Sequence, residues 1–242
     1  MTEHGAERPG FERLPENHSL PGMGRLTVQG SLQLGDVRLD LDLTADPGQL
    51  VGVTGGVGSG KSSALALIAG RLRLAEGRVT LGDLVWDDPT VGTFVADRPV
   101  TLVTQRFQND LPDDLTGVAA VTRRILSITP AHPDAEGTAR RVLTGLGVGD
   151  HVVDRLPDTF SGAEAQRVSI AAALAPDPPV VLLDEPFGAM DKRTGAAVRD
   201  WLAAWFADRQ AIVVIASTRT DHLEELTETI VNLDRDDRAG ED

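Results

Sequence analysis

A glycine-rich loop between an apolar strand and a helix is the feature that most constrains how this chain can fold. The run Gln49 to Thr54 lacks the apolar–polar alternation of a half-exposed strand, which favours a strand buried on both faces. Residues 55–62 then fit the pattern G-x-x-x-x-G-K-[ST], and the run Lys61 to Ala69 favours a helix. Glycines let successive backbone N–H groups curve around an anion, and the helix N-terminus adds its positive end. The sequence therefore predicts a phosphate-binding loop on an α/β fold.

Within this phosphate loop, residues 55–62, each position has an expected role. Lys61 should reach the β- and γ-phosphates of a nucleotide, and the Ser62 hydroxyl should ligate Mg²⁺. The chain has only two lysines, Lys61 and Lys192, and one of them occupies the lysine position of the motif. The loop names no reaction, because kinases, GTPases, helicases and transport ATPases share it. The nucleotide-binding residues expected here are Gly55, Gly56, Val57, Gly58, Ser59, Gly60, Lys61, Ser62 and Ser63.

The rest of the pattern predicts an α/β, P-loop NTPase core with a mostly parallel sheet. Residues 26–43 alternate around a Gly35-Asp36 turn, as in an antiparallel hairpin with one wet face, so we expect an antiparallel β edge subdomain. Residues of about 111–159 carry apolar side chains at helical spacing and predict an inserted helical subdomain. Later strands at 180–183, 212–216 and 230–233 are separated by helices, which implies parallel crossovers.

Composition bounds the domain organisation and the partners. Residues 1–23 are rich in Pro, Gly, Glu and His without period, which predicts a disordered N-terminal arm before one nucleotide-binding domain at 24–242. The net charge of -14 argues against a nucleic-acid partner and against adsorption to an anionic membrane. No run approaches the roughly 20 apolar residues that cross a bilayer, so we expect no direct membrane insertion and a cytoplasmic location.

A second apolar strand ends in two adjacent acids. The run Val180 to Leu183 is followed by Asp184 and Glu185. Because neighbouring side chains on a strand point to opposite sides, the two acids should have different roles. We expect Asp184 to hold Mg²⁺ and Glu185 to orient or deprotonate an attacking water.

The segment upstream of these acids carries a family resemblance. Residues 160–168 read Phe-Ser-Gly-Ala-Glu-Ala-Gln-Arg-Val, and this segment resembles the Leu-Ser-Gly-Gly-Gln signature and following Gln-Arg-Val of the ATP-binding cassette family. The resemblance extends through Asp184-Glu185-Pro186 to Gly188-Ala189-Met190-Asp191, which looks like the family's D-loop. It spans about Arg25 to Asp234, and the block Ser161 to Asp191 is most similar to importer ATPases of the molybdate and sulfate group.

The resemblance implies an ATPase that closes as a homodimer or heterodimer around ATP and Mg²⁺. In that arrangement the signature segment of one subunit faces the γ-phosphate bound at Lys61 of the other, and Ser161 would also cap the following helix. The partner would be an integral membrane permease that docks near the helical lobe, which places the chain at the inner face of the cell membrane. The signature segment comprises Ser161, Gly162, Ala163 and Glu164.

Two further family positions are assigned by their place after strands. Gln105, after the strand 100–104, resembles the Q-loop glutamine that touches Mg²⁺, and Gln108 is the alternative. Thr218 falls at or near the position of the switch histidine, after the strand 212–216. His222 lies one helical turn further on, where we expect an exposed residue rather than a substitute.

Three departures from the family pattern predict weak, slow hydrolysis. Ala163 replaces a glycine, Thr218 replaces a histidine, and residues 25–53 contain no aromatic side chain to stack on adenine. The missing stack should cost about 1 to 2 kcal/mol of nucleotide affinity. The alternative is a nucleotide-gated regulatory subunit, the degenerate half of a heterodimer with little turnover. A GTPase or kinase is disfavoured, because no Asn-Lys-x-Asp motif occurs and the signature would be unexplained.

Overall fold

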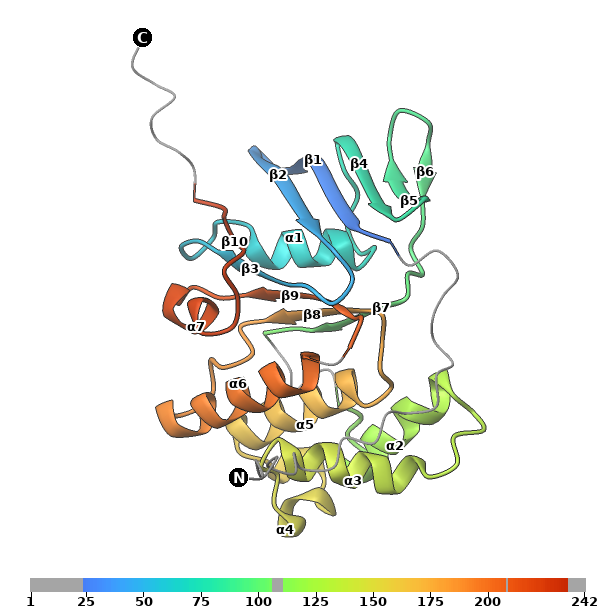
Figure 1. Ribbon diagram of the computed structural model, residues 1–242, viewed down its shortest axis with the longest axis vertical. Helices are drawn as coiled ribbons and strands as arrows, with labels where there is room; N and C mark the ends of the chain where they lie inside the picture. The colour runs from blue at the N-terminus through green and yellow to red at the C-terminus, as the bar shows by residue number, and fades with distance from the viewer. Residues whose placement is uncertain (1–23, 106–110, 208, 235–242) are drawn as a thin grey trace, which may run out of the picture.

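The computed structural model describes residues 24–105, 111–207 and 209–234. The expected N-terminal arm (residues 1–23) and the alternative Q-loop residue Gln108 lie outside the described residues. Within them the chain forms two five-stranded sheets with helices between and below them (Figure 1).

The first sheet is antiparallel and has the strand order β2-β1-β4-β5-β6. In β2 the buried residues alternate with exposed ones, as the hydrophobic pattern predicted, whereas in β1 the alternation is interrupted at Ser31 and Leu32, which are both buried. The two strands pair along their whole length, from Leu26 opposite Ala45 to Leu34 opposite Val37 at the turn. The strands are β1 (Leu26–Leu34), β2 (Val37–Ala45), β4 (Glu76–Leu81), β5 (Leu84–Asp88) and β6 (Thr93–Phe94).

The second sheet is wholly parallel and has the strand order β10-β3-β9-β8-β7. All five residues of β8 and all five of β9 are buried, because this sheet is covered on both faces. Its strands are β3 (Leu50–Thr54), β7 (Val100–Val103), β8 (Val180–Asp184), β9 (Ile212–Ala216) and β10 (Ile230–Asn232). The carboxyl ends of β3, β8 and β9 therefore lie side by side.

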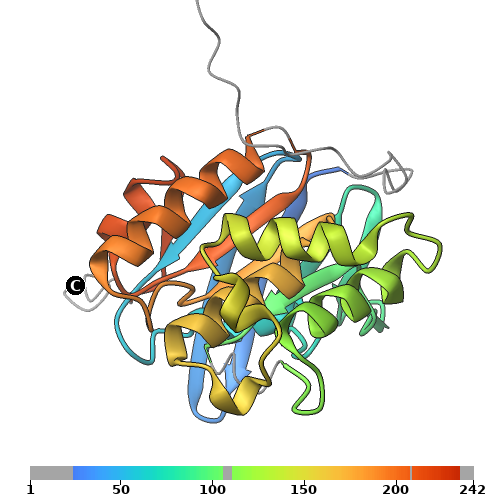
Figure 2. The ribbon, with the colours of Figure 1, turned by 90° about the horizontal axis from the view of Figure 1, so that it is seen from below.

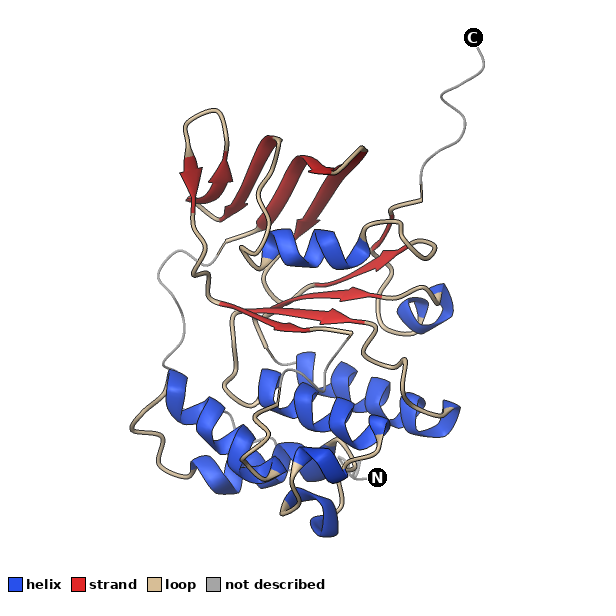
Figure 3. Ribbon diagram, turned by 180° about the vertical axis from the view of Figure 1, so that it is seen from behind, coloured by secondary structure: helices blue, strands red, loops and turns tan. Residues whose placement is uncertain are grey.

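The helices fill the spaces around these sheets. Helix α1 (Lys61–Ile68) lies between the two sheets, α5 (Gly162–Leu174) and α6 (Lys192–Phe206) cover the other face of the parallel sheet, and α7 (Thr220–Glu224) lies at its edge (Figures 1 and 3). A helical lobe packs beneath α5, as the view from below shows (Figure 2). The lobe contains α2 (Gly117–Ile128), α3 (Ala135–Gly145), α4 (Asp150–Val153) and the 3₁₀ helix η2 (Pro157–Thr159).

Two hydrophobic cores meet across the parallel sheet. Alternate residues of β8, Val180 and Leu182, belong to the core shared with α1 and the antiparallel sheet. Their neighbours Val181 and Leu183 belong to the core shared with α5, α6 and the helical lobe. The lobe is thus packed against the same layer that supports the carboxyl end of β8.

The structure confirms the predicted fold class, an α/β P-loop core with an antiparallel sheet and a helical insertion. Most element boundaries agree within one or two residues, and β8 runs one residue further than expected, to Asp184. Strand β6 and the short elements α4 and η2 were not predicted, because two to four residues are too few to show a period.

Candidate functional site

The phosphate loop connects the end of β3 to the start of α1, as the motif requires. Gly60 is the N-cap of α1 and has a φ of 99°, a left-handed conformation that favours glycine. A Cβ on Gly60 would lie 2.5 Å from Leu39 Cδ2, so β2 packs directly on the loop. Because Gly60 has no side chain to cap α1, the N–H groups of the first turn are left for an anion.

Lys61 is buried beneath this loop. Its side chain is 7% exposed, and its ammonium donates to the carbonyl oxygens of Gly55 at 2.7 Å and Gly56 at 2.8 Å. The cation thus lies inside the loop, where it can exchange carbonyl partners for phosphate oxygens. Val57, at the tip, is 99% exposed.

Asp184 lies at the end of β8, beside the start of α1. Its carboxyl is 5% exposed, and burial raises the pKa, while a hydrogen bond with the Ser62 hydroxyl and the charge of Lys61 act in the opposite direction. A hydroxyl and a carboxylate in contact are oxygen ligands of the kind that Mg²⁺ prefers. Among the residues described, no group of three or more acidic or histidine side chains is placed to hold a metal ion.

Glu185 follows in the left-handed region, with a φ of 49°, which is uncommon for a residue with a side chain. Its amide donates to the Ala216 carbonyl at 2.9 Å. Its carboxylate accepts hydrogen bonds from the Thr218 amide at 2.6 Å and from the Ser217 hydroxyl at 3.3 Å. The two adjacent acids therefore have different surroundings, because β8 ends at Asp184 and Glu185 turns away in the left-handed region. Their different roles stay a prediction.

Thr218 contacts Glu185 through its backbone rather than its side chain. The residue is exposed, and the hydrogen bond to the Glu185 carboxylate comes from its amide. The sequence expectation that His222 is exposed was wrong: the ring is partly buried and packs edge-on against Phe187 at 5.6 Å between centroids. Burial lowers the pKa of His222. The short helix α7 turns this side chain back onto Phe187, which sequence spacing alone did not show.

Gln105 lies two residues beyond β7 and is exposed. Its place after a strand of the parallel sheet is as expected, and the choice between Gln105 and Gln108 stays a prediction.

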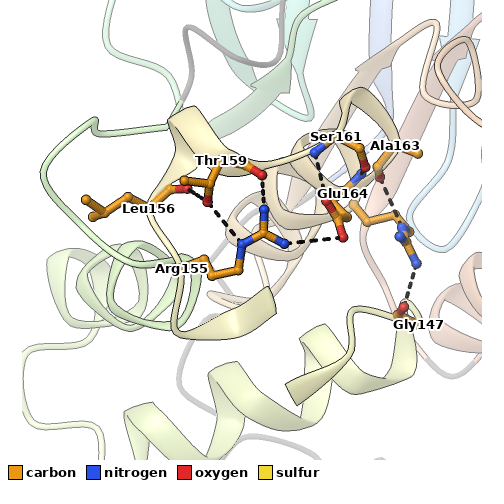
Figure 4. A network of polar contacts seen from close by, with 8 residues as sticks. Gly147, Arg155, Leu156, Thr159, Ser161, Ala163 and Glu164 are labelled. Carbon is orange, nitrogen blue, oxygen red and sulfur yellow. Dashed lines mark hydrogen bonds and ion pairs between the residues drawn. The ribbon is translucent and has the colours of Figure 1, made fainter. Parts of the chain in front are cut away.

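The signature segment begins α5 with a complete capping box. The Ser161 hydroxyl accepts from the Glu164 amide at 3.3 Å, and the Glu164 carboxylate accepts from the Ser161 amide at 2.7 Å (Figure 4). These hydrogen bonds lower the pKa of Glu164. Ser161 itself is exposed, so its hydroxyl is accessible to a second molecule.

Two arginines fix the signature segment to the helical lobe. The Arg155 guanidinium donates hydrogen bonds to the side-chain hydroxyl and to the backbone carbonyl of Thr159 (Figure 4). It also lies 3.8 Å from the Glu164 carboxylate. Arg167 donates to the carbonyls of Ala163 at 3.0 Å and Gly147 at 2.5 Å. The position of Ser161 therefore depends on the lobe.

The phosphate loop opens into a cavity of about 920 Å³ that the signature segment does not line. One wall is the end of the β1–β2 hairpin, where Leu34 and Val37 form a cross-strand pair, and the opposite wall is the end of β10. The expected site residues thus fall into two groups, one at the loop and the acids and one at the start of α5. The described residues that line the cavity are Leu34, Val37, Arg38, Leu39, Asp40, Val57, Gly58, Ser59, Gly60, Asn232, Leu233 and Asp234.

Three residues near the site were not predicted from the sequence. The Asp234 carboxylate accepts from the Gly56 amide at 2.6 Å, and nothing in the sequence indicated that contact. No role was predicted for Ser217, whose hydroxyl donates to the Glu185 carboxylate at 3.3 Å. Gln166 lies inside the signature motif, which was a usable signal, but no role was given to it.

Fold and site together define a P-loop nucleotide-binding protein of the α/β class. Residues 39–188 match the ABC transporter family, to which the chain therefore belongs. This result confirms the resemblance carried by the signature and the acids.

Similar relatives include molybdenum and sulfate import ATP-binding proteins. The chain is 32% identical over 197 residues to a molybdenum import ATP-binding protein ModC of Methylococcus capsulatus, covering 81% of this chain and 54% of the relative. It is 38% identical over 162 residues to a sulfate/thiosulfate import ATP-binding protein CysA of Nephroselmis olivacea, covering 67% and 45%. The chain thus spans about half the length of the curated relatives it matches.

Solved structures agree on the fold. The dimeric structure of a bacterial ABC transporter cassette is 25% identical, covers 87% of this chain and 94% of that chain, and superposes with a TM-score of 0.70. A dimeric post-hydrolysis state of an ATP-binding cassette bound to ADP and Pi has the same TM-score of 0.70, at 24% identity and with the same coverage of both chains.

Proposed function

We propose that this chain is the ATP-binding and ATP-hydrolysing subunit of a membrane importer, and that it acts as a dimer. The observation that carries the proposal is the meeting of Lys61, Asp184 and Glu185 at the carboxyl ends of β3 and β8, with the Glu185 carboxylate held by the segment after β9. Ligands of open α/β sheets bind at this edge.

Each group has a defined task in hydrolysis. The loop amides and Lys61 bind the phosphates, and Ser62 and Asp184 are the residues that would hold Mg²⁺, which neutralises phosphate charge when bound. Glu185 orients a water whose oxygen bonds to the γ-phosphorus while the bond to the bridging oxygen of ADP breaks, and the water's proton passes to the Glu185 carboxylate. Gln105, two residues beyond β7, is the Q-loop glutamine that would contact Mg²⁺.

A second copy supplies the remaining contacts. The described lining residues of the cavity at the phosphate loop do not include Ser161 to Glu164. We infer a head-to-tail dimer in which Ser161 of one copy faces the γ-phosphate held by Lys61 of the other. The solved cassette that is 25% identical to this chain is dimeric, which supports the dimer itself.

The apolar wall of the cavity predicts a modest affinity for ATP. Leu34 and Val37 line the cavity at the hairpin tip, and Val37 is 47% exposed. Aliphatic side chains give a base an apolar surface without the π-stacking of an aromatic ring, which is worth about 1 to 3 kcal/mol per base. We expect micromolar rather than nanomolar binding of ATP.

A groove between the helical lobe and the parallel sheet suits a segment of the permease. It has a volume of about 460 Å³ and lies between β7, α2 and α5. Arg71, Arg123 and Arg124 line it, and no acidic residue is among its described lining residues. In a chain of net charge -14 this is a local positive surface, which favours an acidic segment of a membrane protein.

The membrane attachment follows from that partner. Across the described residues, no helix is long and apolar enough to span a bilayer. From the import relatives, we propose that the chain lies at the inner face of the cell membrane, attached through the permease, and that the direction is import.

Steady-state phosphate release tests the catalytic assignment. Glu185→Gln keeps the shape of the side chain but cannot accept a proton, so we expect phosphate release to fall at least about 100-fold while ATP binding persists. Glu225→Gln, an exposed acid paired with Arg199, is the control and should leave the rate unchanged. Equal rates for Glu185→Gln and the unchanged chain would contradict the proposal.

A regulatory subunit is the second candidate. Ala163 and Thr218 replace a glycine and a histidine that the family pattern would have, and both lie where γ-phosphate contacts are expected. ATP-dependent dimerisation without phosphate release above that of Glu185→Gln would favour this alternative.

A further inference from the structure

Gln166 connects the signature helix to the turn that follows β8. It lies in the second turn of α5, and its side chain is 1% exposed. The amide nitrogen donates to the Glu185 carbonyl at 2.8 Å, and the amide oxygen accepts from the Ala189 amide at 3.1 Å. One buried side chain therefore pairs with the main chain at both ends of this turn.

The Glu185 backbone needs outside support. Its left-handed conformation is unfavourable for a residue with a side chain and persists where surrounding contacts impose it. Its amide is held by Ala216, and its carbonyl accepts from the Gly188 amide at 3.1 Å and from Gln166. The contact from Gly188 is local, three residues away, whereas Gln166 reaches the carbonyl from a separate helix.

The same helix starts at the signature segment. Ser161 is the N-cap of α5, and Gln166 lies five residues further on, in the next turn. A helix of this length moves as a rigid unit, so displacement of Ser161 is passed to Gln166 and from there to the Glu185 carbonyl.

We propose that Gln166 is a positioning residue that sets the backbone of Glu185 for hydrolysis and links it to the signature helix. The inference rests on the proposed ATPase function. In the dimer, Ser161 would contact the nucleotide held by the partner subunit. Any displacement of Ser161 would then move Glu185 of the same chain through Gln166, which couples the two nucleotide sites.

A purely structural role makes a different prediction. A buried amide that only anchors two elements would, when replaced, lower stability without a dependence of turnover on pH. Gln166→Glu separates the two cases, because a carboxylate sets an acceptor against the Glu185 carbonyl, whereas a protonated carboxyl donates to it. Burial raises the pKa of such a carboxyl, which brings its protonation toward neutral pH.

The experiment measures ATP-dependent phosphate release by the full chain with Mg²⁺ over pH 5.5 to 8.5. We expect Gln166→Met to lower kcat about tenfold with an unchanged KM for ATP, and its ratio to the unsubstituted chain to stay flat with pH. Gln166→Glu should be as slow at high pH and recover several-fold relative to the unsubstituted chain as the pH falls. Arg167→Met is the matched control, because it loosens α5 from Gly147 without touching Glu185, and should show no recovery.

Three results would overturn the inference: an unchanged kcat in Gln166→Met, a rise in KM alone, or a flat pH ratio for Gln166→Glu. If the unsubstituted chain releases no phosphate above Lys61→Ala, the proposed function fails, and amide hydrogen exchange decides the inference separately. Gln166→Met must then speed exchange at residues 185–189 and leave the N-terminal turn of α5 unchanged. Unaltered exchange at residues 185–189 would exclude the link.

Discussion

The proposed function places two helix N-termini against phosphate, and the chain builds them in opposite ways. Helix α1 starts at Gly60, a left-handed residue without a side chain, so its first N–H groups remain for an external anion. Helix α5 starts at Ser161 with a capping box, in which Ser161 and Glu164 satisfy each other's amides. We call the N-terminus of α1 the open start, because its N–H groups remain for a ligand. We call the N-terminus of α5 the closed start, because its capping box already satisfies the amides of Ser161 and Glu164.

This difference assigns nucleotide affinity to the open start and ATP-dependent dimerisation to the closed start. A start without a cap gains its missing hydrogen bonds only from the ligand, so α1 and Lys61 should carry nucleotide binding in the single chain. The capped start gains little new from a phosphate except through the exposed Ser161 hydroxyl, and its contribution should appear only when two chains meet. Substitutions at the two starts should therefore affect different measurements.

The largest effect is expected at Lys61. Lys61→Ala removes the only lysine in the phosphate loop and should weaken ATP binding by the single chain at least about 100-fold, in line with the loss of a charge-assisted phosphate contact of about 3 kcal/mol. Isothermal titration with Mg-ATP measures the change. Lys192→Ala is the matched control, because Lys192 is the only other lysine and is exposed at the start of α6. Equal loss in both variants would show that the two helix starts do not differ in the way described.

The second effect is expected at Ser161. Ser161→Ala removes an N-cap and should cost about 1 kcal/mol of unfolding free energy. We expect the ATP affinity of the single chain to stay unchanged and ATP-dependent dimerisation to weaken. Denaturant titration measures the unfolding free energy, and sedimentation measures dimerisation.

Thr116→Ala provides the comparison for Ser161. Thr116 is the N-cap of α2 and accepts from the Ala119 amide at 3.3 Å. It should cost a similar free energy and leave dimerisation intact. Weaker dimerisation in both variants would assign the effect to helix stability and not to the hydroxyl of Ser161.

The open start was predictable from sequence, and most of the closed one was as well. Pattern and spacing predicted the phosphate loop and the paired acids, and the family resemblance predicted the signature segment, because each depends on residues that are close together in the chain. The capping box follows from Ser161 and Glu164 at the correct spacing. The match to the ABC transporter family agrees with these local signals.

Contacts between distant segments were not predictable. Asp234 contacts Gly56 across 178 positions, and Glu185 accepts from Thr218 through a backbone amide whose partner does not depend on side-chain identity. The left-handed φ of Glu185 also leaves no trace in the sequence, because the conformation is imposed by neighbours from β9 and α5. The orientation of His222 toward Phe187 depends in the same way on where α7 ends.

The smallest effect concerns the charge within the capping box. Hydrogen bonds from Ser161 and nearby arginines lower the pKa of Glu164 below its ordinary value of 4.5. A carboxyl with a lowered pKa in the folded state contributes stability that is present above the unfolded pKa and is lost as the pH falls through the folded pKa. Glu164→Gln keeps an oxygen for the Ser161 amide but does not titrate. The unsubstituted chain should therefore be more stable than Glu164→Gln at neutral pH, by about 0.3 to 1 kcal/mol, because an acid in the first turn favours the helix N-terminus.

That advantage should shrink in the acid range, as the pH falls below 4.5, because Glu164 becomes protonated and both chains then carry a neutral group. Thermal melts from pH 3.5 to 7 measure the difference, in which the contributions of all other carboxyls cancel. Glu164→Ala should be less stable than either chain at every pH, because it also leaves the Ser161 amide without its acceptor. A constant difference between the unsubstituted chain and Glu164→Gln across this range would show that the charge of Glu164 does not stabilise the closed start of α5.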